Sequence, residues 1–332
     1  MIIKARTFNK HIFLMIMALL LLAAGCGTGS LQRERLSATQ ASEEPSLNTD
    51  KVMDNIHSIS SYKRGMGTPG EKNTATYLQK ELESYGYLPQ AQVFPYDLQK
   101  EFPRDFRDFQ DDSFWDVDVS ETQKDGESQN IIAIKKPDNN ASQNIILISA
   151  HYDDTGYGAV IDNATGVALL LEAARLTANT NCHAEVRFVL FGGEQCGLNG
   201  SRYYVSKLSE EEKKNMLNIN LDYLGIKGTN NLILATIDGK ENQASSLFKN
   251  FLQSNELQIV NSPASDYVSF ARAGIPAVSL GQLPTPIKME DKYSSLDEMD
   301  KALIEIENSL LDENRLKAAL NMVIKALEQT TN

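Results

Sequence analysis

Five residues with metal-binding or proton-transferring side chains lie just past apolar stretches in the middle of this chain of 332 residues. They are His151, Asp153, Asp162, Glu194 and Asp222. The apolar runs 144–150, 186–191 and 217–224 have the length and composition of buried strands. Because ligands bind beyond the carboxyl ends of the strands in an α/β sheet, we expect these side chains to meet at one edge of a sheet.

An imidazole together with carboxylates is a donor set that suits zinc. His151 and Asp153 are two residues apart, so in an extended chain both side chains project to the same side. The carboxylate can then accept a hydrogen bond from the imidazole, which fixes the tautomer and improves the other nitrogen as a ligand. A nearby carboxylate that binds no metal would take the proton from an attacking water.

Each residue taken singly also has a structural interpretation. Asp153 and Asp162 precede turns or helices, where acids commonly serve as caps, and a single buried histidine is more often structural than catalytic. The joint occurrence of these residues at successive strand ends favours a functional site.

Six motifs lie between about Met53 and Thr331. They are Arg64-Gly65…Gly67-Thr68-Pro69-Gly70-Glu71, His151-x-Asp153, Gly158-Ala159…Asp162-Asn163-Ala164-Thr165-Gly166-Val167, Glu194…Gly197-Leu198…Gly200-Ser201, Asn220-Leu221-Asp222 and Ser265-Asp266-Tyr267…Phe270…Gly274-Ile275-Pro276. Together they resemble family 28 of the metallopeptidases, the zinc aminopeptidases that include secreted bacterial leucyl aminopeptidases and the single-zinc glutaminyl cyclases.

This resemblance implies a role for each candidate residue. His151 and Asp222 would bind one zinc ion, Asp162 would bridge two, Asp153 would orient His151, and Glu194 would be the general base. The family completes the second zinc site with a glutamate directly after the base and a histidine after Ser-Asp. Those two positions hold Gln195 and Tyr267 here, and the other histidines are His11, His57 and His183.

The two substitutions affect one metal. Gln195 offers a neutral carbonyl oxygen, and Tyr267 would have to lose a proton with an ordinary pKa of about 10 to bind as an anion. We therefore expect one zinc ion, held by His151, Asp162 and Asp222, and a doubtful second site. The single-zinc glutaminyl cyclases use the positions that this chain has lost.

Two hypotheses follow. In the first, the protein is a one-zinc hydrolase, an exopeptidase of the aminopeptidase type acting on peptides, in which Glu194 activates water and Tyr267 donates a hydrogen bond to the oxyanion. In the second, it is a catalytically inactive lipoprotein of the same fold that binds peptide or protein ligands in the old cleft. The retained Glu194 favours the first, and the two missing ligands favour the second.

Strand and helix patterns alternate around these residues. The runs 92–96, 129–135, 144–150, 186–191, 217–224, 231–236 and 276–280 indicate strands, and 73–85, 165–178, 200–207, 242–254 and 296–329 indicate helices. This order predicts an α/β fold with three layers, in which a mostly parallel mixed sheet is flanked by helices on both faces as in zinc aminopeptidases. Cys182 and Cys196 flank one strand, so we expect two separate thiols.

The amino-terminal segment has the features of a bacterial lipoprotein signal. Basic residues precede the short apolar run 12–22, and small residues lead to Cys26, the expected lipidation site. A transmembrane anchor is the alternative, but the run is shorter than the ~20 residues that span a bilayer. We expect a signal peptide at 1–25, a lipidated cysteine with a polar tether at 26–50, and an extracytoplasmic domain at 51–332, anchored to the cell membrane through lipid alone.

Within this domain, residues 88–143 contain an insertion. Its aromatic and acidic part, 102–118, is either a lid over a pocket or a packed surface segment, and the lack of periodicity favours the surface segment. Without residues 1–25 the chain has 29 basic and 44 acidic residues, a net charge of −15. Such a charge would repel phosphate backbones, which argues against nucleic acid as a partner.

Overall fold

The computed structural model describes residues 48–96, 126–138, 142–228, 232–262, 264–283 and 295–331. The predicted signal peptide, Cys26, nearly all of the tether and the segment 102–118 lie outside these residues. The helices are α2 (Thr49–Ser60), α3 (Pro69–Ser84), α5 (Thr165–Thr177), α6 (Asn199–Ser206), α7 (Glu210–Asn215), α8 (Gln243–Ser246), α9 (Lys249–Gln253), α10 (Tyr267–Arg272), α11 (Leu296–Leu310) and α12 (Glu313–Thr331). A short π-helical segment, Val160–Ala164, precedes α5.

The strands form one sheet of eight in the order β1-β2-β4-β3-β5-β8-β6-β7. They are β1 (Gln90–Tyr96), β2 (Gly126–Lys135), β3 (Ile145–His151), β4 (Glu185–Phe191), β5 (Met216–Leu221), β6 (Leu232–Thr236), β7 (Gln258–Asn261) and β8 (Ala277–Gln282). The central strands β4, β3, β5 and β8 are parallel, whereas β2 pairs antiparallel with β1 and β4, and β6 pairs antiparallel with β8. The sheet is therefore mixed and mostly parallel, as predicted, and its four-stranded parallel part lies in the centre.

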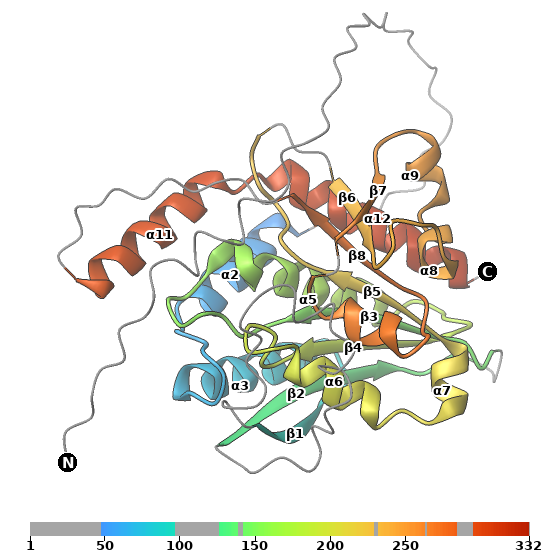
Figure 1. Cartoon of the computed structure of the whole chain (residues 1–332), viewed down its shortest axis with the longest axis horizontal. Helices are drawn as coiled ribbons and strands as arrows, with labels where there is room; N and C mark the ends of the chain where they lie inside the picture. Colours follow the sequence, from blue (N-terminus) through green and yellow to red (C-terminus); the bar gives the residue numbers. More distant parts are fainter. Residues whose placement is uncertain are drawn as a thin grey trace, which may run out of the picture.

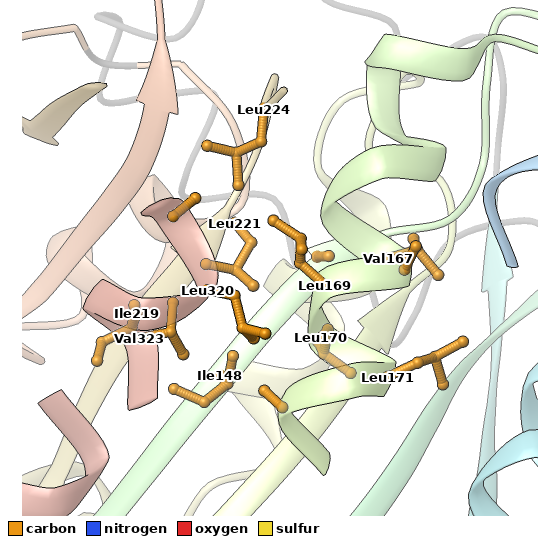
Figure 2. Close-up of a cluster of buried hydrophobic side chains, with 14 of the residues drawn as sticks. Ile148, Val167, Leu169, Leu170, Leu171, Ile219, Leu221, Leu224, Leu320 and Val323 are labelled. Atoms are coloured by element: carbon orange, nitrogen blue, oxygen red, sulfur yellow. The ribbon is translucent and has the colours of Figure 1, made fainter. Parts of the chain in front are cut away.

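Helices cover both faces of the sheet, which makes three layers (Figure 1). Every residue of β3 is buried, and successive side chains point to opposite faces. Ile146 and Ile148 belong to the core that includes residues of α5 and α12, whereas Ile145 and Leu147 belong to the core that includes residues of α6 and α10. Figure 2 shows part of the first core, where Ile148 lies with Leu170 of α5 and Val323 of α12. A strand buried on both sides explains why the run 144–150 is apolar without alternation.

Most of the expected elements are present, and the differences are local. The predicted helix 242–254 is interrupted at Leu247–Phe248, and α2 begins at Thr49, inside the predicted tether. Strand β7 and the helices α7 and α10 were not predicted from the sequence. Cys182 and Cys196 are both thiols, as expected. Among the residues described here, no helix is both long and apolar enough to cross a membrane.

Candidate metal centre

Three neighbouring parallel strands bring the candidate residues together. His151 is the last residue of β3, Asp222 follows β5 directly, and Glu194 follows β4 after two glycines. Because β4, β3 and β5 are adjacent and parallel, their carboxyl ends meet at one edge of the sheet. Ligand atoms of His151, Glu194 and Asp222 all lie within 4.8 Å of one another, and this group can hold a metal ion.

Asp162 reaches the same place from the segment before α5. Its Oδ1 lies 3.0 Å from His151 Nε2, and Asp222 Oδ1 lies 3.5 Å from the same nitrogen. Neither His151 Nε2 nor Asp222 Oδ1 has a hydrogen-bond partner with suitable geometry among the described residues, although both atoms are buried. Unsatisfied buried polar atoms are costly, and a cation between them would satisfy both. The donor set of one imidazole and several carboxylates fits zinc.

The orientation of His151 is set through its other ring nitrogen. Nδ1 lies 3.1 Å from the backbone carbonyl oxygen of Asp153 and 3.5 Å from its Oδ1. Since a carbonyl oxygen only accepts, Nδ1 carries the proton in the neutral ring and Nε2 presents a lone pair to the site. The carboxylate of Asp153 also accepts from the backbone N–H groups of Glu194 and Gln195, at 3.0 and 3.1 Å. Asp153 therefore positions the loop after β4 as well as the imidazole of His151.

Asn163 fixes the position of Asp162 relative to β5. Its Nδ2 donates to the carbonyl of Leu221 at 2.8 Å, and its Oδ1 accepts from the backbone N–H of Gly166 at 2.9 Å. A Cβ at Gly166 would lie 2.3 Å from Asn163 Oδ1 and 2.6 Å from the Leu221 carbonyl oxygen, so only glycine fits. The backbone of Asp162 and Asn163 departs from helical angles, which allows Asp162 to face the strand ends.

Two buried charged groups hold the loop that leads from β3 to Asp162. Asp154 accepts hydrogen bonds from the backbone N–H groups of Arg64, Gly156, Gly158 and Ala159, at 2.6 to 2.9 Å. The fully buried guanidinium of Arg64 lies 3.6 Å from Asp154 and donates to three backbone carbonyls at 3.0 Å or less. These bonds keep the loop in one conformation and thereby fix where Asp162 lies.

A third buried group acts on the same loop from α11. Glu307 accepts from the backbone N–H groups of Val160 and Ile161 and from the hydroxyl of Tyr157, at 2.6 to 3.2 Å. Burial raises the pKa of the Glu307 carboxyl. The two residues before Asp162 are therefore held by a helix from the far end of the chain.

Glycines at the end of β4 aim Glu194 at the site. A Cβ at Gly192 would lie 2.6 to 2.8 Å from atoms of Ser128, Gln129 and Glu71, so the strand end packs directly against β2 and α3. Gly193 has a φ of +69°, in the left-handed region that favours glycine. Thr68 caps the amino terminus of α3, since its side chain accepts from the backbone N–H of Glu71 at 3.3 Å.

The clustering of charges shifts several pKa values. Burial alone would lower the pKa of His151, but the carboxylates around it raise it well above the ordinary value. Burial raises the pKa of Glu194 well above that of an ordinary glutamate, against the opposing effect of His151. Burial would also raise the pKa of Asp162, but His151 and Gln195 lower it on balance.

The two positions where metal ligands are replaced differ from expectation. Gln195 directs its amide nitrogen, not its carbonyl oxygen, at Asp162, with Nε2 3.1 Å from both carboxylate oxygens. Tyr267 is fully buried and donates its hydroxyl to the carbonyl of Ser262 at 2.6 Å. The predicted role of Tyr267 as a donor to the oxyanion was wrong, because its hydroxyl proton is bound to a backbone carbonyl in the protein interior. Burial also raises the pKa of Tyr267 above the ordinary value, which opposes metal binding as a phenolate.

Three residues of the site region were missed as functional candidates. Asp154 and Glu307 hold the loop, and Asp266 is fully buried with a pKa that burial raises to about 7. Asp154 could have been found from the sequence, because it follows His151 and Asp153 in the run His151-Tyr152-Asp153-Asp154. Asp266 could also have been found, because it lies in the motif directly before Tyr267. Glu307 could not have been found, because it lies within a helix with many acids.

Comparisons with known proteins show the family of this chain. The sequence profile of Peptidase family M28 matches residues 130–310, more than half of the chain. Aminopeptidase YwaD of Bacillus subtilis is 36% identical over 159 residues, which are 46% of this chain and 35% of YwaD. The probable lipoprotein aminopeptidase LpqL of Mycobacterium tuberculosis is 38% identical over 100 residues, 29% of this chain and 20% of LpqL. The chain thus aligns with about a third or less of the length of these two relatives.

The likeness to solved structures extends further along the chain. BSAP, a zinc aminopeptidase from Bacillus subtilis, superposes with a TM-score of 0.69 at 20% sequence identity. The superposition covers 86% of this chain and 96% of BSAP. At this identity the likeness establishes the fold, which is the three-layer fold predicted from the sequence.

Proposed function

Because this chain belongs to peptidase family M28, we propose that it is a zinc-dependent exopeptidase of the aminopeptidase type that acts on peptides with a single zinc ion. The observation that carries the proposal is the cluster of ligand atoms at the strand ends. His151, Glu194 and Asp222 lie within 4.8 Å of one another, and the buried His151 Nε2 has no hydrogen-bond partner among the described residues.

Each side chain has a definite part in this proposal. His151, Asp162 and Asp222 would hold the metal, which would supply a Lewis acid that polarises the substrate carbonyl and makes water more acidic. Glu194 takes the proton from the attacking water and passes it to the leaving amine. Its raised pKa, caused by burial, suits a group that must both accept and donate this proton. Asp153 fixes the imidazole and the backbone of Glu194 together.

A test of this function measures metal content and hydrolysis separately. We expect the purified protein to bind one zinc ion tightly and to hydrolyse aminoacyl anilides. Glu194→Gln should lower kcat by ~10²-fold or more with zinc content unchanged. Loss of zinc in this variant would make Glu194 a ligand instead of the base, since one of its oxygens lies within 4.8 Å of the ligand atoms of His151 and Asp222.

The alternative is an inactive protein of the same fold that binds peptides. It is favoured by the replacement of both second-site ligands by Gln195 and Tyr267. A wild-type protein that binds zinc but hydrolyses no peptide or anilide, with Glu194→Gln indistinguishable from it, would establish this alternative. Two tightly bound ions per chain would contradict the single-zinc site in either case.

We also propose that the protein is a lipoprotein, anchored outside the cytoplasm through Cys26. The basic residues, the short apolar run and Ala24-Gly25-Cys26 support this proposal, and a relative, LpqL, is named a probable lipoprotein. Cys26→Ser should leave an uncleaved precursor or release the protein from membranes. A wild-type protein without diacylglycerol, together with a variant that keeps the same mass and membrane association, would rule this out.

A further inference from the structure

The side chain of Gln195 makes an unusually symmetric contact with the candidate ligand Asp162. Its Nε2 lies 3.1 Å from Oδ1 and 3.1 Å from Oδ2 of the same carboxylate. A carboxylate only accepts hydrogen bonds, so the face of the amide that meets Asp162 must be the NH₂ group. The amide nitrogen therefore lies where a cation bound to both oxygens of Asp162 would lie.

Other contacts of Gln195 hold this side chain in place. Its backbone N–H donates to Asp153 Oδ2 at 3.1 Å, next to the matching bond from Glu194 to Oδ1 of the same carboxylate. Gln195 is therefore fixed at its backbone by the residue that also fixes His151.

The contact matters because Asp162 faces His151 at the same time. Oδ1 of Asp162 is 3.0 Å from His151 Nε2 and also accepts from the amide of Gln195. Asp222 and Glu194 add two further carboxyl groups beside the same imidazole, with Asp222 Oδ1 at 3.5 Å from Nε2. Without the donor from Gln195, Asp162 would be repelled by these groups and could rotate out of the position in which it faces His151.

We propose that Gln195 is a positioning residue whose amide takes the place of a second cation beside Asp162, so that the site holds one metal ion with Asp162 in a fixed orientation. This inference rests on the proposed single-zinc site. The proposed role of Gln195 differs from the simple loss of a metal ligand. A lost ligand would leave a weak second metal site, whereas the NH₂ group of Gln195 occupies that place and repels cations.

The first experiment compares zinc affinity in the full-length protein after metal removal, by competition with a chromophoric chelator. Gln195→Met keeps the approximate volume and removes the donor. We expect it to bind one ion 10- to 100-fold more weakly than the wild type, the usual effect of removing a group that orients a ligand. Gln258→Met, at an exposed position on β7, is the matched control and should leave affinity unchanged.

The second experiment counts ions in Gln195→Glu, which has nearly the same shape and therefore keeps the fold. It places a second carboxylate against Asp162, and two facing carboxylates bind a cation between them. We expect a second zinc ion per chain at excess zinc, an outcome that a purely structural role for Gln195 would not produce.

The outcomes separate this inference from the proposed function. Gln195→Met with zinc affinity within twofold of the wild type, or Gln195→Glu with a single ion at excess zinc, would overturn the role of Gln195 and leave the single-zinc site intact. A wild-type protein that binds no zinc would overturn both.

Discussion

Glu71 carries a buried proton that should make the stability of this protein depend on pH. It lies in the first turn of α3 and is 1% exposed. Its Oε2 accepts from the backbone N–H of Gly67 at 2.6 Å, and its Oε1 accepts from the hydroxyl of Ser128 at 2.5 Å. Burial raises its pKa from the ordinary 4.5 to about 8. The folded protein thus keeps a proton that the unfolded chain releases between these two values.

The sign and the size of the effect follow from this difference. The contribution of this proton to the free energy of unfolding is fully present below pH 4.5 and is lost as the pH rises toward 8. Each pH unit between the two pKa values lowers the free energy of unfolding by about 1.4 kcal/mol. The free energy of unfolding therefore falls by about 3 kcal/mol at pH 7 and by about 5 kcal/mol once the pH exceeds 8. These are upper limits, because the amino terminus of α3 favours the ionised form.

Glu71→Gln removes the titration and keeps the shape. The amide can accept from Gly67 and donate to Ser128, so we expect the variant to match the wild type at pH 4.5 and to exceed it by up to about 3 kcal/mol at pH 7. The assay is urea unfolding of metal-free protein at pH 4.5, 7 and 9, with the exposed Glu83→Gln on the same helix as control. A difference between Glu71→Gln and wild type that stays constant across these pH values would refute the reasoning.

Three further changes test the framework of the site. Asp154→Asn removes the counter-ion of the buried Arg64 and should cost about 3–5 kcal/mol in urea unfolding, while the exposed Asp297→Asn should cost little. Tyr267→Phe leaves a backbone carbonyl without its donor, so we expect a loss of about 1–2 kcal/mol with zinc content unchanged, and a changed zinc content would revive Tyr267 as a metal-site residue. Gly192→Ala should lower both the melting temperature and kcat, since its Cβ would overlap neighbouring atoms at 2.6 to 2.8 Å, and wild-type kcat would contradict the tight fit.

The sequence was most informative where strands are buried on both faces. The continuous apolar run 144–150 predicted β3, and the polar residues after it marked the edge where the site lies. Helix α7 was missed although Ser209 and Glu212 form a capping box that the sequence displays. Strand β7 had little signal, because its four residues are exposed or only half-buried and their pattern resembles a loop.

Contacts between distant residues account for most of what could not be predicted at the site. Arg64 and Asp154 are 90 residues apart, and no local pattern shows that one buries its charge against the other. The direction of the Tyr267 hydroxyl depends on a backbone carbonyl in the preceding loop. The Gln195 amide contacts Asp162 across 33 residues of sequence, and no local pattern shows that its nitrogen faces that carboxylate. The sequence identified most of these residues, but it could not show which atoms of their side chains contact one another.

The hydrogen bonds of the acids around His151, including the bond from Gln195 to Asp162, argue for one metal ion. Asp153 is satisfied by two backbone N–H groups, and Asp162 by the amide of Gln195. Asp222 Oδ1 and His151 Nε2 are both buried, have no hydrogen-bond partner with suitable geometry among the described residues, and lie 3.5 Å apart. Two atoms this close are satisfied by a single cation, and a second cation would have to displace hydrogen bonds that the protein already makes.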